Sequence, residues 1–420
     1  MELVRSYTLR LKDIPLVKFS LLCNRSLVNY TENSTYHLKI NKIYSESKKW
    51  LPKSLLLQGE LTERKLRNWI NKRKVPQNRQ FATNLLASIN DGKNLMNYVD
   101  VTQALSLNDA YWITPDDMSF KWQDCNLYEH PFDERLSMVA FTGCRVLVSG
   151  VVTTPEMTTT GALKKCWIRR QGNVYLMKGD GFFPKDDGRT QATIEWYAAQ
   201  IAEVMNIPHI SYELDEFEHN DTKREAVSLC KLFTSADVGY LDAYTYFMCK
   251  GIDVSKMDDG DLENQVRLAK LFGYKEYADM MVFDSVICNK DRHYGNFGYL
   301  INNNTTEFIK PAPLWDNGRS LLYDASDYEL HHLEAYMKGA GGQGYVLPFD
   351  TQAKLFVEER HISGLTKLTT FTFKNHPKYP LAEKTLEILS TFVRKRARNI
   401  LRLYQVREND KKSLGAAYEG

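Results

Sequence analysis

Apolar and polar positions alternate along the middle of the chain in patterns that predict a strand and then a helix. After a turn at Gly172, residues 174–177 form a short apolar run that ends at Lys178, which is typical of a strand. From Thr190 to Asn206, apolar positions recur at intervals of four, three and four residues, which predicts an amphipathic helix. These positions are Ile194, Ala198, Ile201 and Met205.

A second pattern predicts a hairpin further along the chain. Residues 297–301 are apolar and favour a strand, three asparagines at 302–304 favour a turn, and residues 307–310 fit a returning strand. The two open ends of a hairpin lie next to each other. Asn296, just before the hairpin, and Asp316, just after it, are therefore expected to converge on one metal ion.

Two basic stretches are predicted to be helical. Residues 62–80 carry seven lysines and arginines against one acid, with a small apolar face and Pro76 as a stop signal. This stretch is interpreted as a solvated amphipathic helix or, alternatively, as a contact for DNA or a partner protein. Near the carboxyl terminus, an apolar stripe is expected to pack a helix onto the domain, leaving the basic residues 394–398 on its solvated face. The stripe is Leu386, Leu389, Val393, Ala397, Ile400 and Tyr404.

Composition narrows the class of protein. The 420 residues, 43% of them apolar, suffice for two or three domains with ordinary cores. The 55 basic and 52 acidic residues leave a net charge of +3, which argues against a protein that coats nucleic acid. No apolar run is long enough to span a bilayer, and residues 1–13 lack the apolar core of a signal peptide. A cytoplasmic protein with no membrane partner is expected.

Cysteine and histidine spacing gives no sign of a structural metal site. The seven cysteines are scattered without a C-x-x-C pair, so neither a disulfide framework nor a zinc site is expected. The nine histidines contain one adjacent pair, His331 and His332, and adjacent side chains on a helix point apart.

Three polar residues that follow one another in a fixed order along the chain give the strongest indication of the protein's chemistry. Asp291 and Asn296 have the spacing Asp-x-x-x-x-Asn, and Asp316 follows twenty positions later beside a glycine turn. Protein kinases use this order: the first aspartate accepts the proton of the attacking hydroxyl, and the other two residues hold Mg²⁺. The first pair alone is more often a cap or a turn. Its significance comes from matching residues upstream.

The upstream residues fit the same chemistry. Lys178 is predicted to hold the phosphates of ATP, and Glu195, early in the expected helix, to orient this lysine. The alternatives are an edge-strand lysine and a solvated acid in the first helical turn. The small residues before the strand suit a loop whose backbone N–H groups cover phosphates, or else an ordinary polar hairpin. They are Thr158, Thr159, Thr160 and Gly161.

Together these residues resemble the HipA-like family of bacterial serine/threonine kinases. The match covers roughly residues 143–404, and its most specific part looks like the family's catalytic loop. That string is Asn289-x-Asp291-Arg292-His293-x-x-Asn296. The resemblance implies ATP and Mg²⁺ as cofactors, with Asp291 as catalytic base and Asn296 and Asp316 as metal ligands. The first 135 or so residues show no such resemblance.

The resemblance also assigns the nucleotide contacts. Lys178 matches the family's strand lysine, and Thr158 matches a loop serine or threonine that some members autophosphorylate. The loop departs from the family pattern S-x-A-G-A-Q-x-K at Thr160 and Leu163, so Thr159 and Thr160 compete with Thr158 as the modified residue.

Residues 227–233 lie where the family's adenine-contacting segment would be, so the resemblance implies that Cys230 and Leu232 contact the adenine of ATP. The expected fold is α+β, a two-lobed protein-kinase-like domain with an additional N-terminal region. The expected regions are an accessory region at 1–137, a mostly β lobe at 138–235 and a mostly helical lobe at 236–420.

The expected activity is that of a serine/threonine protein kinase with an unidentified protein substrate. Two alternatives remain open. The same residues would serve a kinase of a small molecule, which only substrate profiling separates. A non-enzymatic protein that binds DNA or a partner through residues 62–80, with a degenerate kinase domain, would instead show salt-dependent DNA binding without ATP affinity.

Overall fold

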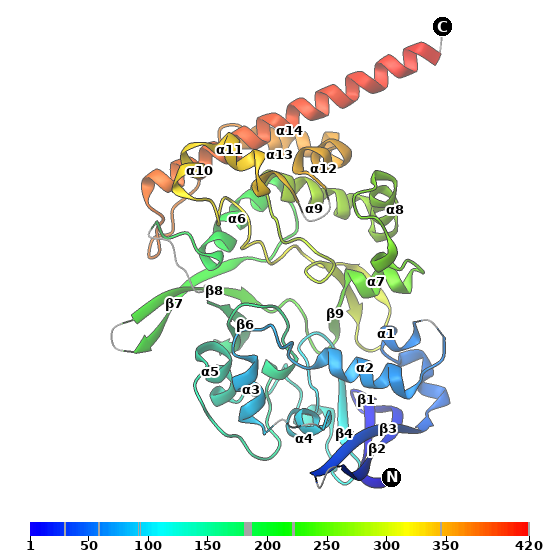
Figure 1. Cartoon of the computed structure of the whole chain (residues 1–420). Helices are drawn as coiled ribbons and strands as arrows, with labels where there is room; N and C mark the ends of the chain where they lie inside the picture. Colours follow the sequence, from blue (N-terminus) through cyan, green and yellow to red (C-terminus); the bar gives the residue numbers. More distant parts are fainter. Residues whose placement is uncertain are drawn as a thin grey trace. The chain divides into compact units, whose positions relative to one another are not determined.

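The chain folds into two compact units, each assembled from separate segments (Figure 1). The computed structural model describes residues 1–28, 31–57, 59–90, 92, 94–179, 187–220, 223–344 and 347–418. Unit 1 comprises Met1–Lys178, Lys231–Leu241 and Tyr299–Lys310. Unit 2 comprises Gly179–Cys230, Asp242–Gly298 and Pro311–Gly420. The expected division at 137/138 and 235/236 stays a prediction.

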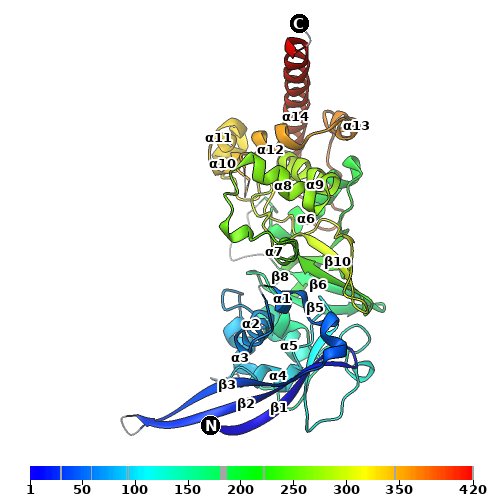
Figure 2. The same ribbon diagram turned by 90° about the vertical axis from the view of Figure 1, so that its right-hand side faces the viewer.

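Unit 1 contains a four-stranded antiparallel sheet in the order β3-β2-β1-β4, with long strands at its N-terminal end (Figure 2). Tyr7, Leu9 and Leu11 alternate along β1 and are buried, because residues two apart share one face of a strand. Tyr7 lies opposite Phe19 of β2, and their rings stack with centroids 5.6 Å apart. The strands are β1 (Glu2–Leu11), β2 (Ile14–Val28), β3 (Thr31–Ile43) and β4 (Tyr111–Pro115).

Unit 1 also holds the strand and the hairpin expected from the sequence, and both predictions are confirmed. The run 174–177 lies in β6 (Asn173–Lys178), which pairs antiparallel with β5 (Lys165–Arg170). The predicted hairpin is β10 (Gly298–Asn302) and β11 (Phe308–Pro311), joined in one sheet to β9 (Val238–Asp242).

Short helices complete unit 1. The α-helices are α1 (Lys53–Leu56), α2 (Glu63–Arg73), α3 (Ala82–Ser88), α4 (Asn97–Thr102) and α5 (Glu134–Thr142). The 3₁₀ helices are η1 (Ser45–Trp50), η2 (Trp122–Asp124) and η3 (Glu156–Thr158). The predicted basic helix is α2, whose apolar residues Leu66, Trp69 and Ile70 are buried.

Unit 2 is built around α9 (Tyr274–Ile287), which packs against α8 (Leu262–Phe272), α12 (Phe349–Phe356) and α14 (Glu383–Tyr418) (Figure 1). Every residue of α9 from Tyr277 to Ile287 is buried, so the helix is covered on all sides. Within the described ranges, no helix is long and apolar enough to cross a membrane.

The remaining elements of unit 2 surround this core. The helices are α6 (Gln191–Met205), α7 (Ala243–Cys249), α10 (Asp327–His331), α11 (Leu333–Lys338) and α13 (Glu359–Leu368), with 3₁₀ turns η4 (Val254–Lys256) and η5 (Ala340–Gly342). The antiparallel hairpin is β7 (Tyr212–Asn220) and β8 (Lys223–Lys231).

Helix α6 confirms the predicted helix between Thr190 and Asn206. The Thr190 hydroxyl accepts the backbone N–H of Thr193, and the Thr193 hydroxyl accepts that of Thr190, which satisfies two free donors at the helix start. At the other end, Asn206 adopts a left-handed conformation with φ 55° and ends the helix.

The interpretation of the basic cluster on α14 was wrong for Arg396. The apolar stripe packs as expected, with Leu389, Val393 and Ala397 buried. Arg396, however, is also buried: it donates to the carbonyl oxygen of Ser285 at 3.0 Å and pairs with Asp350 at 2.7 Å. Its charge therefore fastens α14 to the start of α12 and the end of α9 instead of facing solvent.

Asp279 of α9 binds three basic side chains and links this helix to α13. Its carboxylate accepts from His361 at 2.9 Å, Arg360 at 3.0 Å and Lys275 at 3.0 Å. Burial raises the pKa of Asp279, but these partners outweigh burial and lower the pKa to about 2.

This carboxylate predicts an acid-sensitive contribution to stability. The pKa of this carboxyl group is lower in the folded protein than in the unfolded chain. Its ionised form therefore stabilises the fold at pH values above its ordinary pKa, and this stabilisation is lost as the pH falls toward 2. Asp279→Asn should therefore be less stable than the wild type near neutral pH, and the gap should close between about pH 5 and 2. Urea denaturation midpoints of the wild type and Asp279→Asn, measured across this pH range, test the prediction, and Asp327→Asn at an exposed position is the control. A difference in midpoint that stays constant with pH would contradict the prediction.

Candidate active site

The predicted catalytic loop leaves α9 in a sharp reversal within unit 2. Cys288 has φ 51°, which ends the helix and turns the chain into residues 289–296. Asn296 closes this loop: its side-chain oxygen accepts the backbone N–H of His293 at 3.0 Å, and its amide donates to the carbonyl of Asp291 at 2.5 Å. Asn296 and the backbone of Asp291 are thus held together.

Arg292 connects this loop to the segment that carries Asp316. Its guanidinium forms a two-point ion pair with Asp284 of α9, at 2.9 Å and 3.1 Å. It also donates to the carbonyl oxygens of Asn296, at 3.2 Å, and Trp315, at 2.9 Å, and to the side chain of Asn317, at 2.7 Å. One buried cation therefore holds α9, the loop and both neighbours of Asp316.

Arg292 and Asp284 were missed as functional residues. Sequence reasoning treated Arg292 as part of a motif and did not consider Asp284. Both side chains are almost fully buried, at 4% and 2% exposure. The pKa of Arg292 is raised: burial opposes its charge, but the Asp284 carboxylate more than compensates. An aspartate in the mostly apolar second half of α9, eight residues before an arginine, was the available signal.

Asp316 occupies an unusual backbone conformation that orients it. Its φ of 60° lies in the left-handed region, which non-glycine residues seldom adopt. Its N–H donates to the hydroxyl of Tyr212 at 3.0 Å, which supports this geometry. At Gly318, an added Cβ would lie 2.8 Å from the carbonyl oxygen of Gln191, so the turn after Asp316 packs tightly onto the start of α6.

The carboxylate of Asp291 is partly open to solvent and pairs with Arg319. Its side chain is 36% exposed, and Arg319 donates to it at 3.1 Å. Arg319 also donates to the hydroxyl of Tyr323 at 3.1 Å. Burial tends to lower the pKa of Arg319, but Tyr323 and Asp291 raise it overall. A cation therefore lies beside the predicted base.

Glu195 and Lys178 are buried, at 2% and 5% exposure, which excludes the solvated first-turn acid. Within unit 2, Glu195 accepts a hydrogen bond from the hydroxyl of Ser228 at 2.6 Å. Lys178 is the last residue of β6 and of the first segment of unit 1. Burial of a charged side chain is costly unless it is partnered, so neither residue is an ordinary surface charge.

The predicted phosphate loop lies in unit 1 and is not a hairpin. Thr158 is buried and donates to the carbonyl oxygen of Leu105 at 2.7 Å. The Thr159 hydroxyl accepts the indole N–H of Trp167 at 2.8 Å. Thr160 is exposed, and Gly161 adopts φ +93°, which glycine tolerates without strain.

The residues predicted to contact adenine lie at the end of β8 and just after it. Cys230 is buried and lies opposite Tyr212 in the β7–β8 hairpin. Leu232 is half-buried, and its N–H donates to the carbonyl oxygen of Val174 in β6 at 2.9 Å. Both lie in the connection that leads from unit 2 into the second segment of unit 1.

The donors at the loop suit a Mg²⁺ ion. Asn296 and Asp316 carry hard oxygen atoms, which Mg²⁺ prefers. The side-chain oxygen of Asn296 accepts one hydrogen bond, from His293, which leaves a lone pair for a cation. In the part of the chain that the structure describes, no cluster of three or more His, Cys, Asp or Glu residues could hold a metal. Mg²⁺ commonly takes its other ligands from phosphates and water.

Comparison with known proteins places this geometry in a fold. No family model and no curated protein matches the chain. The HipA of the Shewanella oneidensis MR-1 toxin–antitoxin system, solved with HipB and operator DNA, has a TM-score of 0.52 and 12% identity, covering 96% of this chain and 99% of that chain. The chain has a HipA-like kinase fold. The Helicobacter pylori proinflammatory kinase CtkA has a TM-score of 0.45 and 18% identity, covering 59% of this chain and 95% of that chain.

The fold resemblance expected from the sequence is therefore confirmed, as is the expected mixture of helices and strands. It also extends further than expected, because coverage of 96% includes most of the first 135 residues. At 12% identity, that part of the likeness is invisible to sequence reasoning.

Proposed function

We propose that this protein is an ATP- and Mg²⁺-dependent serine/threonine protein kinase of HipA-like type with a two-lobed catalytic domain. The observation that carries the proposal is the buried Arg292 guanidinium, which holds Asn296 and the two neighbours of Asp316 at once. Phosphoryl transfer depends chiefly on positioned charge, so a rigid anchor beneath these groups is what the chemistry requires.

Each residue has a role in this proposal. Asp291 accepts the proton of the substrate hydroxyl, while Asn296 and Asp316 hold Mg²⁺. When bound, Mg²⁺ neutralises charge on the β- and γ-phosphates. Lys178 contacts the phosphates and Glu195 orients this lysine.

The other nucleotide contacts come from the backbone in this proposal. N–H groups of residues 158–161 cover the phosphates. The segment containing Cys230 and Leu232 holds the adenine. Arg319, beside Asp291, keeps the carboxylate oriented toward the hydroxyl.

The direct test is incubation of the purified protein with Mg²⁺ and γ-labelled ATP, alone and with a generic protein substrate, followed by phosphosite mapping. Label on the loop or on the added protein supports a protein kinase. ATP binding without protein label would favour the small-molecule kinase. Absence of ATP binding would contradict the proposal.

Loop autophosphorylation, if it occurs, is expected on Thr160. Thr158 and Thr159 use their hydroxyls in internal hydrogen bonds, whereas Thr160 is exposed and accessible to a phosphoryl donor. Thr160→Val should remove the loop label, and Thr158→Val should retain it. Mass spectrometry of the loop peptide distinguishes the two variants, and label that persists in Thr160→Val would contradict the assignment.

A DNA or antitoxin-like partner is a second candidate function. Arg64, Arg67 and Lys72 of α2 are exposed and form a basic surface. The solved complex of the Shewanella HipA contains HipB and operator DNA. Two other cations of residues 62–80 cannot contribute, because Arg73 pairs with Asp109 and Arg79 is buried against Glu156. Salt-dependent DNA binding that charge reversal at Arg64 and Arg67 abolishes would support this function.

A further inference from the structure

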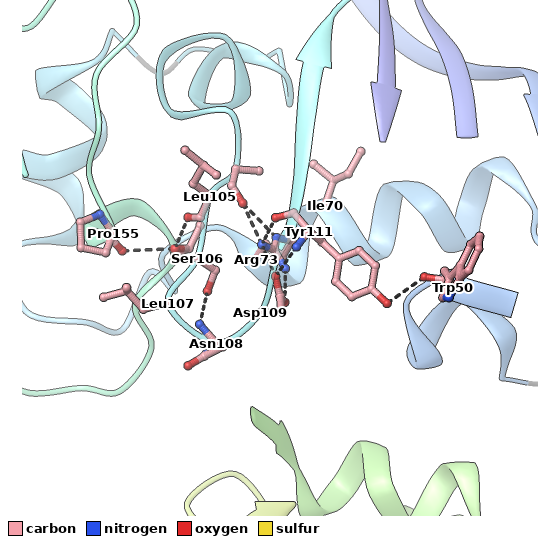
Figure 3. Close-up of polar contacts among 12 residues, drawn as sticks. Trp50, Ile70, Arg73, Leu105, Ser106, Leu107, Asn108, Asp109, Tyr111 and Pro155 are labelled. Carbon is pink, nitrogen blue, oxygen red and sulfur yellow. Dashed lines mark hydrogen bonds and ion pairs between the residues drawn. The ribbon is translucent and has the colours of Figure 1, made fainter. Parts of the chain in front are cut away.

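A loop of the N-terminal region is clamped at both ends by Arg73 of α2 (Figure 3). We call residues 104–111 the brace loop. Arg73 donates twice to the carbonyl oxygen of Ala104, at 2.8 Å and 3.2 Å, and once to that of Tyr111, at 3.0 Å. It also forms a two-point ion pair with Asp109, at 2.6 Å and 3.1 Å. With 9% exposure, the Arg73 side chain cannot reach a ligand.

Between its clamped ends, the brace loop bonds to two segments expected to surround ATP. The carbonyl oxygen of Leu105 accepts the hydroxyl of Thr158 in the predicted phosphate loop at 2.7 Å. The carbonyl oxygen of Leu107 accepts the hydroxyl of Thr234 at 2.5 Å, just after the predicted adenine segment. The carbonyl of Asn108 accepts the N–H of Tyr240 at 2.7 Å. One loop therefore spans both segments within unit 1.

The residues that follow α2 hold the phosphate loop a second time. Arg79 donates to the carbonyl oxygens of Glu156, at 2.9 Å, Thr159, at 3.2 Å, and Lys165, at 2.6 Å. Its pair with Glu156, at 3.0 Å, is completely buried. The backbone N–H of Gln80 also donates to the carbonyl oxygen of Ala162 at 2.8 Å.

We infer that Arg73 is a positioning residue for nucleotide binding, acting through the brace loop. The N-terminal region is then part of the ATP site's framework, because it sets the phosphate loop and the post-adenine segment against one support. This inference rests on the proposed kinase function. Arginine is required here because its planar fork reaches two carbonyl groups and a carboxylate together, which a lysine ammonium cannot do.

The test compares Arg73→Lys with Arg5→Lys. Arg5 is a matched control in unit 1, since its guanidinium also reaches separate acceptors, the carboxylates of Asp100 and Asp117, neither of which belongs to the brace loop. Arg73→Lys should raise the KM for ATP about tenfold, the effect of one or two lost buried hydrogen bonds, with kcat at saturating ATP nearly unchanged. Arg5→Lys should leave the KM for ATP unchanged.

A local readout accompanies the kinetics. Amide hydrogen exchange in residues 158–165 of the ATP-free protein should be faster in Arg73→Lys than in the wild type or in Arg5→Lys. A change in overall stability alone would not produce this local difference together with a selective rise in KM.

A milder variant guards against misfolding of Arg73→Lys. Thr234→Val removes only the hydroxyl bonded to Leu107 and should also raise the KM for ATP. An unchanged KM in both Arg73→Lys and Thr234→Val, in an enzyme that binds ATP, would overturn the inference and leave the proposed kinase standing. A wild-type protein without ATP affinity would overturn both.

Discussion

Asp291→Ala and Asp316→Ala should each lower phosphoryl transfer by a factor on the order of 10³ or more while leaving the fold intact. In the proposed mechanism, the first variant loses the group that accepts the hydroxyl proton, and the second loses the carboxylate that holds Mg²⁺ against the phosphates. Neither side chain supports the core: Asp291 is 36% exposed, and Asp316 is partly exposed.

Single-turnover transfer from labelled ATP, with circular dichroism to confirm folding, measures this effect. Asp327→Ala is the matched control, since it makes the same chemical change at an exposed residue in the first turn of α10. Full activity in either purified Asp291→Ala or Asp316→Ala would sink the catalytic assignment. An equal loss in Asp327→Ala would show that the assay reports on something other than the site.

Removing the Arg292 guanidinium should have the largest effect on stability. In Arg292→Met, Asp284 would remain as an unpaired buried carboxylate, and the carbonyl oxygens of Asn296 and Trp315 would lose their donor. Breaking a buried ion pair from one side costs about 3–5 kcal/mol. Activity should fall as well, because the segments that carry Asn296 and Asp316 would no longer share an anchor.

Urea denaturation of Arg292→Met and Asp284→Asn tests this prediction. Exposed Arg267 on α8 provides the control, because Arg267→Met removes the same group from a surface position and should change stability by less than about 0.5 kcal/mol. Equal stabilities for Arg292→Met and Arg267→Met would refute the anchoring role. Lost activity with intact stability would instead assign Arg292 to orientation alone.

The candidate site divides into what pattern recognition can find and what it cannot. The spacing of Asp291, Asn296 and Asp316 suggested the candidate residues, and the hairpin prediction gave a reason to expect Asn296 and Asp316 near each other. In the sequence, Arg292 could be recognised only as one position of the catalytic-loop motif. Its importance depends on Asp284, which precedes it in the chain, and on Asn317, which follows it. These side chains come together around Arg292 only after folding.

Local periodicity determined the placement of the strand that ends at Lys178, of α6 and of the β10–β11 hairpin, because these patterns depend on neighbours within a few residues. The sequence alone also determined the kinase resemblance, through the short string around Asp291.

Only the tertiary structure decided which charges are buried. Arg73, Arg79, Arg292 and Arg396 read as solvated or unassigned in the sequence, yet each binds a carbonyl oxygen of a distant segment and pairs with a carboxylate. A charge pattern describes only the order of charged residues along the chain, whereas the burial of a side chain depends on which distant segments pack over it. The role that we infer for the first 135 residues was hidden for the same reason: their contacts with the predicted phosphate loop join positions more than fifty residues apart.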